Sequence, residues 1–328
     1  MPLYIEFPSW IDPFVVSFLP IRWYAVMYLV AFAIAYALYR WQLRRDKTRT
    51  IDDDTSEMLF IWGVVGLLIG AHLFSILFYG DTKYYLTHPW MIFWPFRNGH
   101  FVGLPGMSYH GGVVGALVAG MIYAHVKKFP LLKYVDYIVA GIPLGYTFGR
   151  LGNFINGELY GRVTTKSWGM VFPTAPSFPT TQEWVRNVAD AHGIEYVIGD
   201  MVNLPRHPSQ LYEAFFEGIV LFLILWFVCR PMIRRLSLKP GSMLAFYIFG
   251  YGLFRFFIEY CRQPDADIGY VICGGSGCDN IALFQSFLNI SKGQVFCLIM
   301  IISAIALFII VNRRREKNVV KGNKGPSR

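Results

Sequence analysis

Apolar segments alternate with polar ones along the whole chain, and seven of the apolar segments contain very few charged residues. A transmembrane helix needs about 17 to 25 mainly apolar residues to cross a hydrocarbon layer of about 30 Å. The seven segments have roughly this length, so the pattern predicts a bundle of seven transmembrane helices. The predicted spans lie at about 23–39, 58–79, 109–126, 134–151, 211–229, 242–260 and 294–311.

Basic residues collect at alternate connections between these spans. Of the 30 Lys and Arg residues, 19 lie within the segments 40–49, 127–133, 230–239 and 313–328. Because loops rich in Lys and Arg stay on the cytoplasmic side of a membrane, this asymmetry places all four segments in the cytoplasm. We therefore expect a periplasmic N-terminus and a cytoplasmic C-terminus.

The predicted organisation is one membrane domain, residues 1–312, with an irregular head region on its periplasmic side. The head is an insertion at about 153–208, and a second outer loop runs over about 261–291; both are rich in Pro, Gly and aromatic residues. Residues 313–328 form a basic cytoplasmic tail. Residues 1–20 lack the basic start and the cleavage site of a signal peptide, so we expect the first span to remain in the mature protein.

Composition supports the membrane assignment. The 328 residues are 55% hydrophobic and 16% charged, whereas about a quarter of the residues in a typical soluble domain are charged. The predicted fold class is therefore an all-α polytopic membrane protein. A net charge of +9 would suit a nucleic-acid-binding protein, but the basic residues follow the membrane pattern, so we expect no nucleic-acid partner. The five cysteines form no CxxC pair, and we expect no metal or other cofactor.

Charged residues inside the sixth span need a partner or a function, because burying a charge near the middle of a membrane costs about 2.5 to 3.5 kcal/mol. Tyr251, Arg255 and Glu259 are spaced at i, i+4 and i+8, which places them on one helical face, with Arg262 near the same face. A simple ion pair between Arg255 and Glu259 would explain part of this pattern. The additional Tyr and Arg favour an anion-binding site.

The end of the fourth span carries a second polar group. Arg150 and Asn153 lie one helical turn apart, and Asn156 and Glu158 follow among several glycines. A glycine-rich helix end with Arg150 reaching toward the membrane surface is one interpretation. It leaves the two asparagines and the glutamate unexplained, and so a polar cavity beside a broken helix is the alternative.

Several other polar residues near the outer ends of spans are candidates for the same site. His110 opens the third span, before a stripe of small residues suited to close helix packing. It is either a core histidine or, with a reference pKa near 6.5, a general base. Trp23 suits an aromatic belt at the membrane surface. Gln210, Tyr212 and Glu213 would line the site or hold the bundle together, and we favour the second role.

Four motifs, in order along the chain, resemble those of the bacterial prolipoprotein diacylglyceryl transferases. The resemblance covers nearly the whole length, with the predicted seven spans between and around the motifs. The motifs are SYHGG at 108–112, GRLGNFINGELYGR at 149–162, RHPSQLYE at 206–213 and GYGLFRFFIEYCRQPD at 250–265.

The resemblance implies a multi-pass enzyme of the bacterial inner membrane, with its active site toward the periplasm. Such enzymes move the diacylglyceryl group of phosphatidylglycerol onto the lipobox cysteine of a preprolipoprotein signal peptide and release glycerol 1-phosphate. The partners would be these two substrates and the surrounding membrane lipids. By similarity, the catalytic residues are His110, Arg150, Arg255 and Tyr24, and the residues that bind phosphatidylglycerol are Arg150, Asn153, Glu158, Gly161, Tyr251, Arg255 and Glu259.

Within this reading, the guanidinium groups of Arg150 and Arg255 would hold the phosphate of the lipid, since their geometry matches phosphate oxygens. His110 would take the proton of the cysteine thiol, with Tyr24, Tyr251 or a lipid oxygen as alternatives. Glu158 and Glu259 would orient the arginines.

The chain departs from the family pattern at a few positions. The outer loop with Cys273 and Cys278 is longer than usual, and these two cysteines are close enough to form a disulfide in an oxidising compartment. The other departures are Ala25, His72, Ser75 and Cys261.

Three other functional classes fit less well. A transporter would share the intramembrane charges and glycine-broken helices, but we find no internal repeat. An intramembrane serine protease would use Ser108 or Ser276, and neither has a nucleophile-elbow sequence around it. A metal-dependent enzyme is not supported either, because His88, His100 and His110 lack the spacing of metal ligands.

Overall fold

The computed structural model describes residues 3–16, 21–79, 82–97, 99–101, 106–264, 269–275 and 277–313. Contacts divide the chain into two compact units, of which the first combines Met1–Gln42 with Val135–Arg328 and the second is Leu43–Tyr134. Residues 314–328, most of the predicted basic tail, and Ser276 lie outside the described residues.

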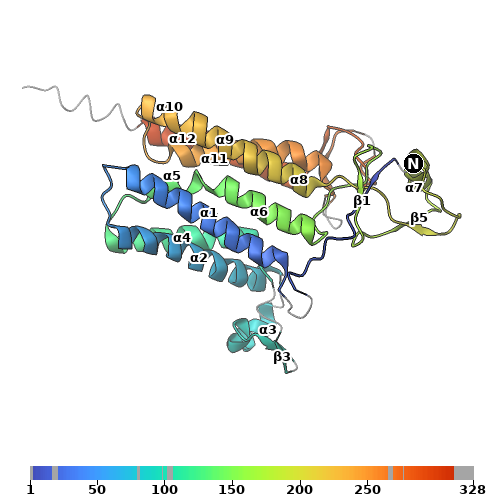
Figure 1. Cartoon of the computed structure of the whole chain (residues 1–328), viewed down its shortest axis with the longest axis horizontal. Coiled ribbons are helices and arrows are strands. Elements are labelled where there is room, and N and C mark those ends of the chain that lie inside the picture. The colour runs from blue at the N-terminus through green and yellow to red at the C-terminus, as the bar shows by residue number, and fades with distance from the viewer. Residues whose placement is uncertain are drawn as a thin grey trace, which may run out of the picture. The chain divides into compact units, whose positions relative to one another are not determined.

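Long helices form the first unit, and they confirm a mostly helical, polytopic architecture (Figure 1). Within the described residues of the whole chain, five helices are long and apolar enough to cross a membrane, where the sequence pattern predicts seven. They are Trp23–Arg45 (α1), Asp53–Phe78 (within α2, Asp53–Tyr79), Ser209–Arg235 (α8 to α10), Ser242–Cys261 (α11, Ser242–Ile258, with η4, Glu259–Cys261) and Lys292–Arg313 (α12).

The prediction of a single helix at 134–151 is wrong. The structure has two shorter helices instead, α5 (Leu131–Val139) and α6 (Ile142–Ile155), separated by a turn at residues 140–141. Pro143 lies in the first turn of α6. Proline has no amide hydrogen and its ring clashes with the preceding helical turn, so it is compatible with a helix start and not with a helix interior. This break allows α6 to take its own direction.

The segment Ser209–Arg235 is helical throughout but irregular. It begins with α8 (Ser209–Glu213), and two π-helical stretches, η2 (Ala214–Val220) and η3 (Ile224–Cys229), enclose the short α9 (Leu221–Leu223) before α10 (Arg230–Arg235). The first stretch lies so close to α6 that a Cβ atom on Gly218 would be 2.1 Å from Thr147 Oγ1. The glycine therefore allows this helix to approach α6, next to the residues of the site described below.

The apolar core of the first unit connects these helices. Ala140 from the α5–α6 turn, Leu221, Leu225 and Met243 form one buried cluster, with Tyr251 packed at its edge. The N-terminus of α11 is fixed by Asp136 of α5, whose carboxylate accepts hydrogen bonds from the amides of Gly241 at 2.7 Å and Leu244 at 2.9 Å.

The head has short strands, one helix and its own small cores. Strand β1 (Ile5–Glu6) pairs in parallel with β4 (Met170–Val171), and β5 (Phe178–Pro179) pairs antiparallel with β6 (Met201–Val202) beside α7 (Glu183–His192). Figure 1 shows these elements together at one end of the unit. A third pair, β7 (Tyr270–Cys273) and β8 (Asn289–Ser291), lies in the outer loop, where Cys273 and Cys278 form the disulfide that their spacing allows.

The second unit is built on α2 and α4 (Tyr109–Lys127), whose backbones lie very close to each other. A Cβ atom on Gly115 would be 2.1 Å from the carbonyl oxygen of Gly66, and one on Gly111 would be 2.3 Å from that of Gly70. The small-residue stripe at the start of the third predicted span is therefore a helix-packing surface. The unit also contains α3 (Thr82–Thr87), η1 (Pro89–Ile92) and the pair β2 (Phe96–Arg97) and β3 (His100–Phe101).

We predict that Asp136→Ala lowers the stability of the first unit. Loss of the carboxylate leaves two amides at the start of α11 without an acceptor, and loss of a helix cap of this kind costs about 0.5 to 2 kcal/mol. Thermal unfolding of the detergent-solubilised protein should show a lower midpoint. Glu195→Ala, which changes an exposed carboxylate of the head, serves as the control and should leave the midpoint unchanged. Equal midpoints for both variants and the unchanged protein would contradict the capping role of Asp136.

Candidate active site

Three arginines from different parts of the first unit converge on one buried carboxylate, Glu213 of α8. Arg150 Nε of α6 lies 2.8 Å from Glu213 Oε2, and Arg255 Nη1 of α11 lies 3.2 Å from the same oxygen. Arg262 Nη1, just after η4, donates a hydrogen bond of 2.6 Å to Glu213 Oε1. Glu213 thus contacts three positively charged side chains. The first and the last of them, Arg150 and Arg262, are more than 100 residues apart in the sequence.

A second carboxylate, Glu259, shares two of these arginines. Arg255 Nη2 lies 2.9 Å from Glu259 Oε2, one helical turn along the chain, and Arg262 Nε lies 3.8 Å from the same oxygen. The ion pair expected from the i, i+4 spacing is therefore present. It is part of a larger cluster, because Arg255 also contacts Glu213.

Tyr146 and Glu217 complete the cluster, and sequence reasoning missed both. The Tyr146 hydroxyl accepts a hydrogen bond of 2.6 Å from Arg150 Nε and lies 2.6 Å from Glu217 Oε2 and 3.2 Å from Glu213 Oε2. A phenol has one proton to donate, so the two carboxylates share it. Two sequence features could have identified them. A tyrosine lies four residues before Arg150, and two glutamates lie four residues apart within an apolar segment.

The side chains of the cluster differ in their exposure. The side chains of Arg150, Arg255 and Arg262 are 17 to 19% exposed, whereas that of Glu213 is 0% exposed. The carboxylate is therefore fully buried, whereas each arginine side chain keeps part of its surface exposed; Arg255 Nη1, the atom that faces Glu213, is itself buried. Arginine is well suited to bind phosphate or carboxylate groups through paired hydrogen bonds.

From Arg150 a chain of polar contacts runs along the end of α6. Arg150 Nη1 donates to Asn153 Oδ1 at 3.2 Å, and Asn153 Nδ2 donates to Glu158 Oε1 at 2.9 Å. Asn156 Nδ2 donates to the same oxygen at 3.3 Å. The structure thus connects Arg150, Asn153 and Glu158, and the interpretation as a bare glycine-rich helix cap does not account for these bonds.

The aromatic candidates Tyr24 and Tyr251 lie next to this group. The Tyr251 ring makes an edge contact with the Tyr146 ring, with 5.9 Å between their centroids. Tyr24 packs against Gly152 of α6, where a Cβ atom would be 3.2 Å from Tyr24 Cα, and its hydroxyl donates to that of Tyr28 at 3.0 Å. Glycine at 152 therefore lets α1 lie directly against the part of α6 that holds Arg150 and Asn153.

Gly161 occupies a crossing of three chain segments. Its amide donates to the carbonyl of His207 at 2.8 Å, and a Cβ atom would lie 2.2 Å from the carbonyl oxygen of Cys261. Burial, together with the positive charges of Arg162 and Lys166, lowers the pKa of His207 to about 4. This histidine is therefore neutral at physiological pH. The crossing requires glycine at position 161, because a side chain there would collide with the carbonyl oxygen of Cys261.

The favoured role of Gln210, Tyr212 and Glu213 in holding the bundle together agrees with the contacts of Glu213, which joins α8 to arginines of α6, α11 and the segment after η4 and lies at the centre of the arginine cluster. Its position at the start of a helix that approaches α6 and α11 brings it within reach of all three arginines. Gln210 does have a structural contact, since its Nε2 donates to the main-chain oxygen of Glu158 at 2.7 Å. Tyr212 accepts a hydrogen bond of 2.9 Å from Trp168 of the head.

His110 belongs to the second unit and lies in the first turn of α4, after Ser108, whose hydroxyl caps the helix. It is exposed, so the interpretation as a core histidine is wrong. Within the described ranges, no three His, Cys, Asp or Glu side chains are grouped so that they could hold a metal ion.

Comparison with known proteins gives a consistent result. A family model described as prolipoprotein diacylglyceryl transferase matches residues 13–310. Proteins named phosphatidylglycerol–prolipoprotein diacylglyceryl transferase are 46% identical in Treponema denticola, over 99% of both chains, and 45% identical in Treponema pallidum, over 97% of this chain and 98% of the relative. The Chlorobaculum tepidum relative of the same name is 41% identical over 97% of this chain and 96% of its own. The chain therefore belongs to the prolipoprotein diacylglyceryl transferase family.

Proposed function

We propose that this protein transfers the diacylglyceryl group of phosphatidylglycerol to the lipobox cysteine of a preprolipoprotein, the first step of lipoprotein maturation. The observation that carries the proposal is the group of three arginines held over the buried Glu213 in a chain of this family. A membrane enzyme acting on an anionic lipid needs such a group, because the phosphate must be bound and its growing charge stabilised.

The reaction joins the cysteine sulfur to a glycerol carbon and breaks the bond between that carbon and a phosphate oxygen. The bonding electrons leave with the oxygen, so glycerol 1-phosphate departs with one more negative charge than the phosphodiester carried. Arg150 and Arg255 bind the phosphate and stabilise this charge, with Arg262 beside them. In a site of low dielectric constant, such preorganised charges are usually the largest contribution to catalysis.

The thiol must lose its proton to become a good nucleophile, since a free cysteine has a pKa near 8.5. His110 is the proposed base because a neutral imidazole accepts a proton at physiological pH. Tyr24, Tyr251 and a lipid oxygen remain the alternative acceptors.

The other predicted residues position the lipid and its arginines. Glu259 contacts Arg255 and Arg262, and Asn153 and Glu158 extend from Arg150, so these side chains set the direction of the guanidinium groups. Tyr251 supports the Tyr146 ring, and Gly161 permits the crossing beside the site.

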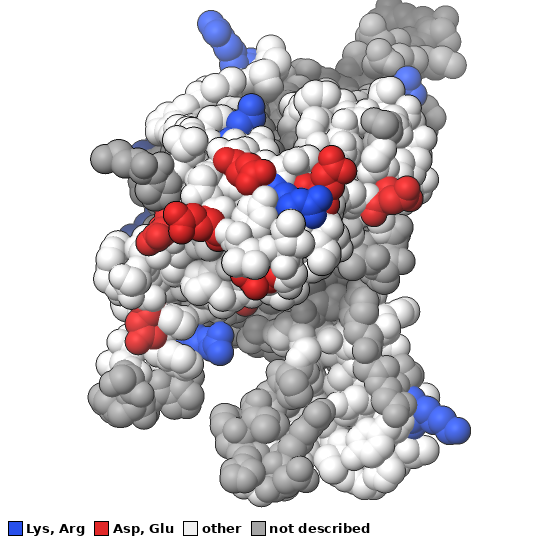
Figure 2. Space-filling view, turned by 90° about the vertical axis from the view of Figure 1, so that its right-hand side faces the viewer, with Lys and Arg blue, Asp and Glu red and all other residues white. Residues whose placement is uncertain are grey.

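We also propose seven spans, a periplasmic N-terminus and a site that faces the periplasm. In this topology, two spans are added to the five long apolar helices. One is α4, and the other is formed by α5 and α6 together. The distribution of Lys and Arg supports this orientation. In contrast to the basic segments assigned to the cytoplasm, the head, which faces the viewer in Figure 2, has mainly acidic residues among its exposed charged side chains. They are Glu183, Asp190, Glu195 and Asp200, with Lys166 as the exposed base.

We predict that the purified protein, incubated with phosphatidylglycerol and a lipobox peptide, adds a diacylglyceryl mass to the peptide cysteine. Arg255→Ala should lower the turnover by about 100-fold or more while the protein remains folded, because a preorganised donor to the transition-state charge is lost. Arg235→Ala, which removes an exposed arginine at the end of α10, is the matched control and should retain normal turnover. Near-normal turnover of Arg255→Ala would contradict the phosphate-binding role, and no product with the unchanged protein would contradict the proposed function.

We further predict that His110→Gln, which keeps a polar side chain but cannot accept the thiol proton, lowers turnover by about 100- to 10,000-fold. The loss should shrink as the pH rises through the pKa of the peptide thiol, because the substrate then supplies its own thiolate. Turnover measured from pH 6 to pH 9.5 would show this recovery. A loss that does not depend on pH, or no loss, would assign the proton transfer to another group.

A further inference from the structure

The hydroxyl group of Tyr146 has three polar neighbours and only one proton of its own. Arg150 Nε donates to it at 2.6 Å, Glu217 Oε2 lies 2.6 Å away, and Glu213 Oε2 lies 3.2 Å away. An ionised carboxylate only accepts hydrogen bonds, and a phenol has a single proton to donate. With both carboxylates ionised, one of the two oxygen–oxygen contacts therefore lacks a proton.

One additional proton on Glu217 Oε2 turns all three contacts into hydrogen bonds. Glu217 then donates to the Tyr146 oxygen, which also accepts from Arg150, and the proton of Tyr146 is donated to Glu213. A phenol oxygen can accept hydrogen bonds while its own proton is donated. Because the bound species is a proton, it fits into an existing contact of 2.6 Å and requires no cavity.

Glu217 is the carboxylate of the cluster whose charge has the least direct compensation. Glu213 contacts three arginines, and Glu259 contacts two. Glu217 is 1% exposed, and within the part of the chain that the structure describes it forms no ion pair and its Oε1 atom has no hydrogen-bond partner. A buried carboxylate without a paired cation is costly in its charged form. An added proton therefore goes to Glu217 before the other two glutamates.

Charged and titratable groups face Glu217 from four of the elements around η2. They are Tyr146 and Arg150 of α6, Glu213 of α8, Arg255 of α11 and Cys297 of α12. None of them is a histidine, and the short α9 contains no titratable residue.

The fully ionised cluster is electrically balanced before a lipid binds. It has three arginines and three glutamates, which are Arg150, Arg255, Arg262, Glu213, Glu217 and Glu259. A bound phosphodiester adds one negative charge, whereas protonation of Glu217 leaves one positive charge to meet it. Because uncompensated charge is costly in a site of low dielectric constant, the binding of the lipid and the binding of the proton favour each other.

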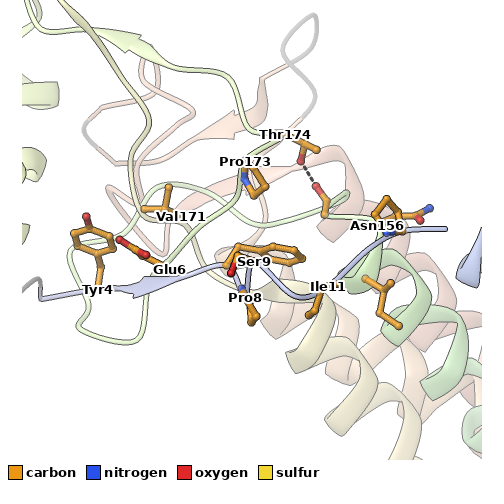
Figure 3. Close-up of a pocket in the computed structure, with 13 residues that line it drawn as sticks. Tyr4, Glu6, Pro8, Ser9, Ile11, Asn156, Val171, Pro173 and Thr174 are labelled. Carbon is orange, nitrogen blue, oxygen red and sulfur yellow. Dashed lines mark hydrogen bonds between the residues drawn. The ribbon is translucent and has the colours of Figure 1, made fainter. Parts of the chain in front are cut away.

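Neighbouring segments supply no other cation to the cluster. Arg162 and Arg206 of the head are buried, but their hydrogen bonds go to main-chain oxygens and uncharged side chains, and neither pairs with a carboxylate among the described residues. At the end of α6 there is a pocket of about 430 Å³, where Figure 3 shows Asn156 and Glu6. Its described lining residues include no Lys or Arg. The balancing charge of the protein must therefore come from the cluster itself.

We propose that Glu217 is a proton-binding residue linked to lipid binding, and that the Glu217–Tyr146 contact takes up one proton when the phosphate of phosphatidylglycerol binds to the arginines. This inference rests on the proposed function, in which the arginines bind that phosphate. Glu217 does not touch the lipid; it is a positioning residue that acts through Tyr146 and Arg150. Because the lipid-bound form holds one more proton than the free form, a rise in pH favours the free form and weakens lipid binding.

Equilibrium binding of a short-chain phosphatidylglycerol to the protein in uncharged detergent tests this link. From pH 6 to pH 9.5 the Kd should rise by up to about tenfold per pH unit, which is the limit for the uptake of one proton. Calorimetric titrations in buffers of different ionisation enthalpy should show an uptake approaching about one proton per lipid. The phosphodiester of the lipid stays a monoanion over this range, so the change must come from the protein.

Glu217→Gln keeps the size of the side chain, and its amide donates to Tyr146 as the protonated acid does. In this variant the Kd should vary by less than about twofold over the same pH range, with no proton uptake. At pH 9.5 it should be about tenfold or more below the Kd of the unchanged protein, since the variant needs no proton. Damage to the fold would weaken binding at every pH. Glu195→Gln, at an exposed position of the head, is the control and should keep the full pH dependence.

A Kd that does not change with pH would overturn the proposal, and so would a pH dependence that persists in Glu217→Gln. If Glu217→Gln does not fold, Tyr146→Phe replaces it, because this change removes the oxygen that accepts the proton. A full pH dependence in folded Tyr146→Phe would also overturn the proposal. The phosphate site fails in a different way: lipid binding would then be equal in Arg255→Ala and the unchanged protein, whether or not it depends on pH.

Discussion

The buried carboxylate of Glu213 is the constraint on which the rest of the site depends. Three guanidinium groups placed together in a membrane protein repel one another and lose most of their hydration, so they require a counter-charge at their centre. Glu213 supplies that charge with both oxygens, and Glu259 adds a second carboxylate beside Arg255 and Arg262. The arginines are thereby fixed in place before a substrate arrives, so that in the proposed function a bound phosphate would meet donors that need little rearrangement.

Irregular helices make this arrangement possible. The break before α6 and the π-helical turn after Glu213 bring two helices together closely enough that Gly218 has no room for a side chain beside Thr147. Asp136, in the helix before the break, holds the start of α11, which carries Arg255. Helix-breaking residues and π turns weaken a helix, and they are tolerated here because neighbouring segments satisfy the freed groups.

The sequence predicted the local parts of the site well. The i, i+4 spacing of Arg255 and Glu259 and the one-turn spacing of Arg150 and Asn153 depend only on helix geometry, and both pairs are in contact. The length and apolar character of five spans were also predicted correctly. The resemblance of the motifs to one family was confirmed by the comparisons.

The remaining features depend on contacts between distant segments. Glu213 and Tyr146 are 67 residues apart, and no periodicity connects them. The N-terminal strand β1 pairs with β4 more than 160 residues later, which a pattern of short strands in a proline-rich region does not predict. The break at Gly141 and Pro143 was visible in the sequence, but the apolar character of the surrounding segment outweighed it in the span prediction.

The central claim is that Glu213 holds the three arginines as a single phosphate-binding site. The most direct test is kcat/KM for phosphatidylglycerol in Glu213→Gln, which keeps the size of the side chain and removes its charge, beside Glu183→Gln at an exposed position of α7. The account predicts a fall of about 100-fold or more in Glu213→Gln, because the arginines lose their common anchor, and no change in the control. A value for Glu213→Gln within about threefold of the unchanged protein, in a folded sample, would contradict the claim.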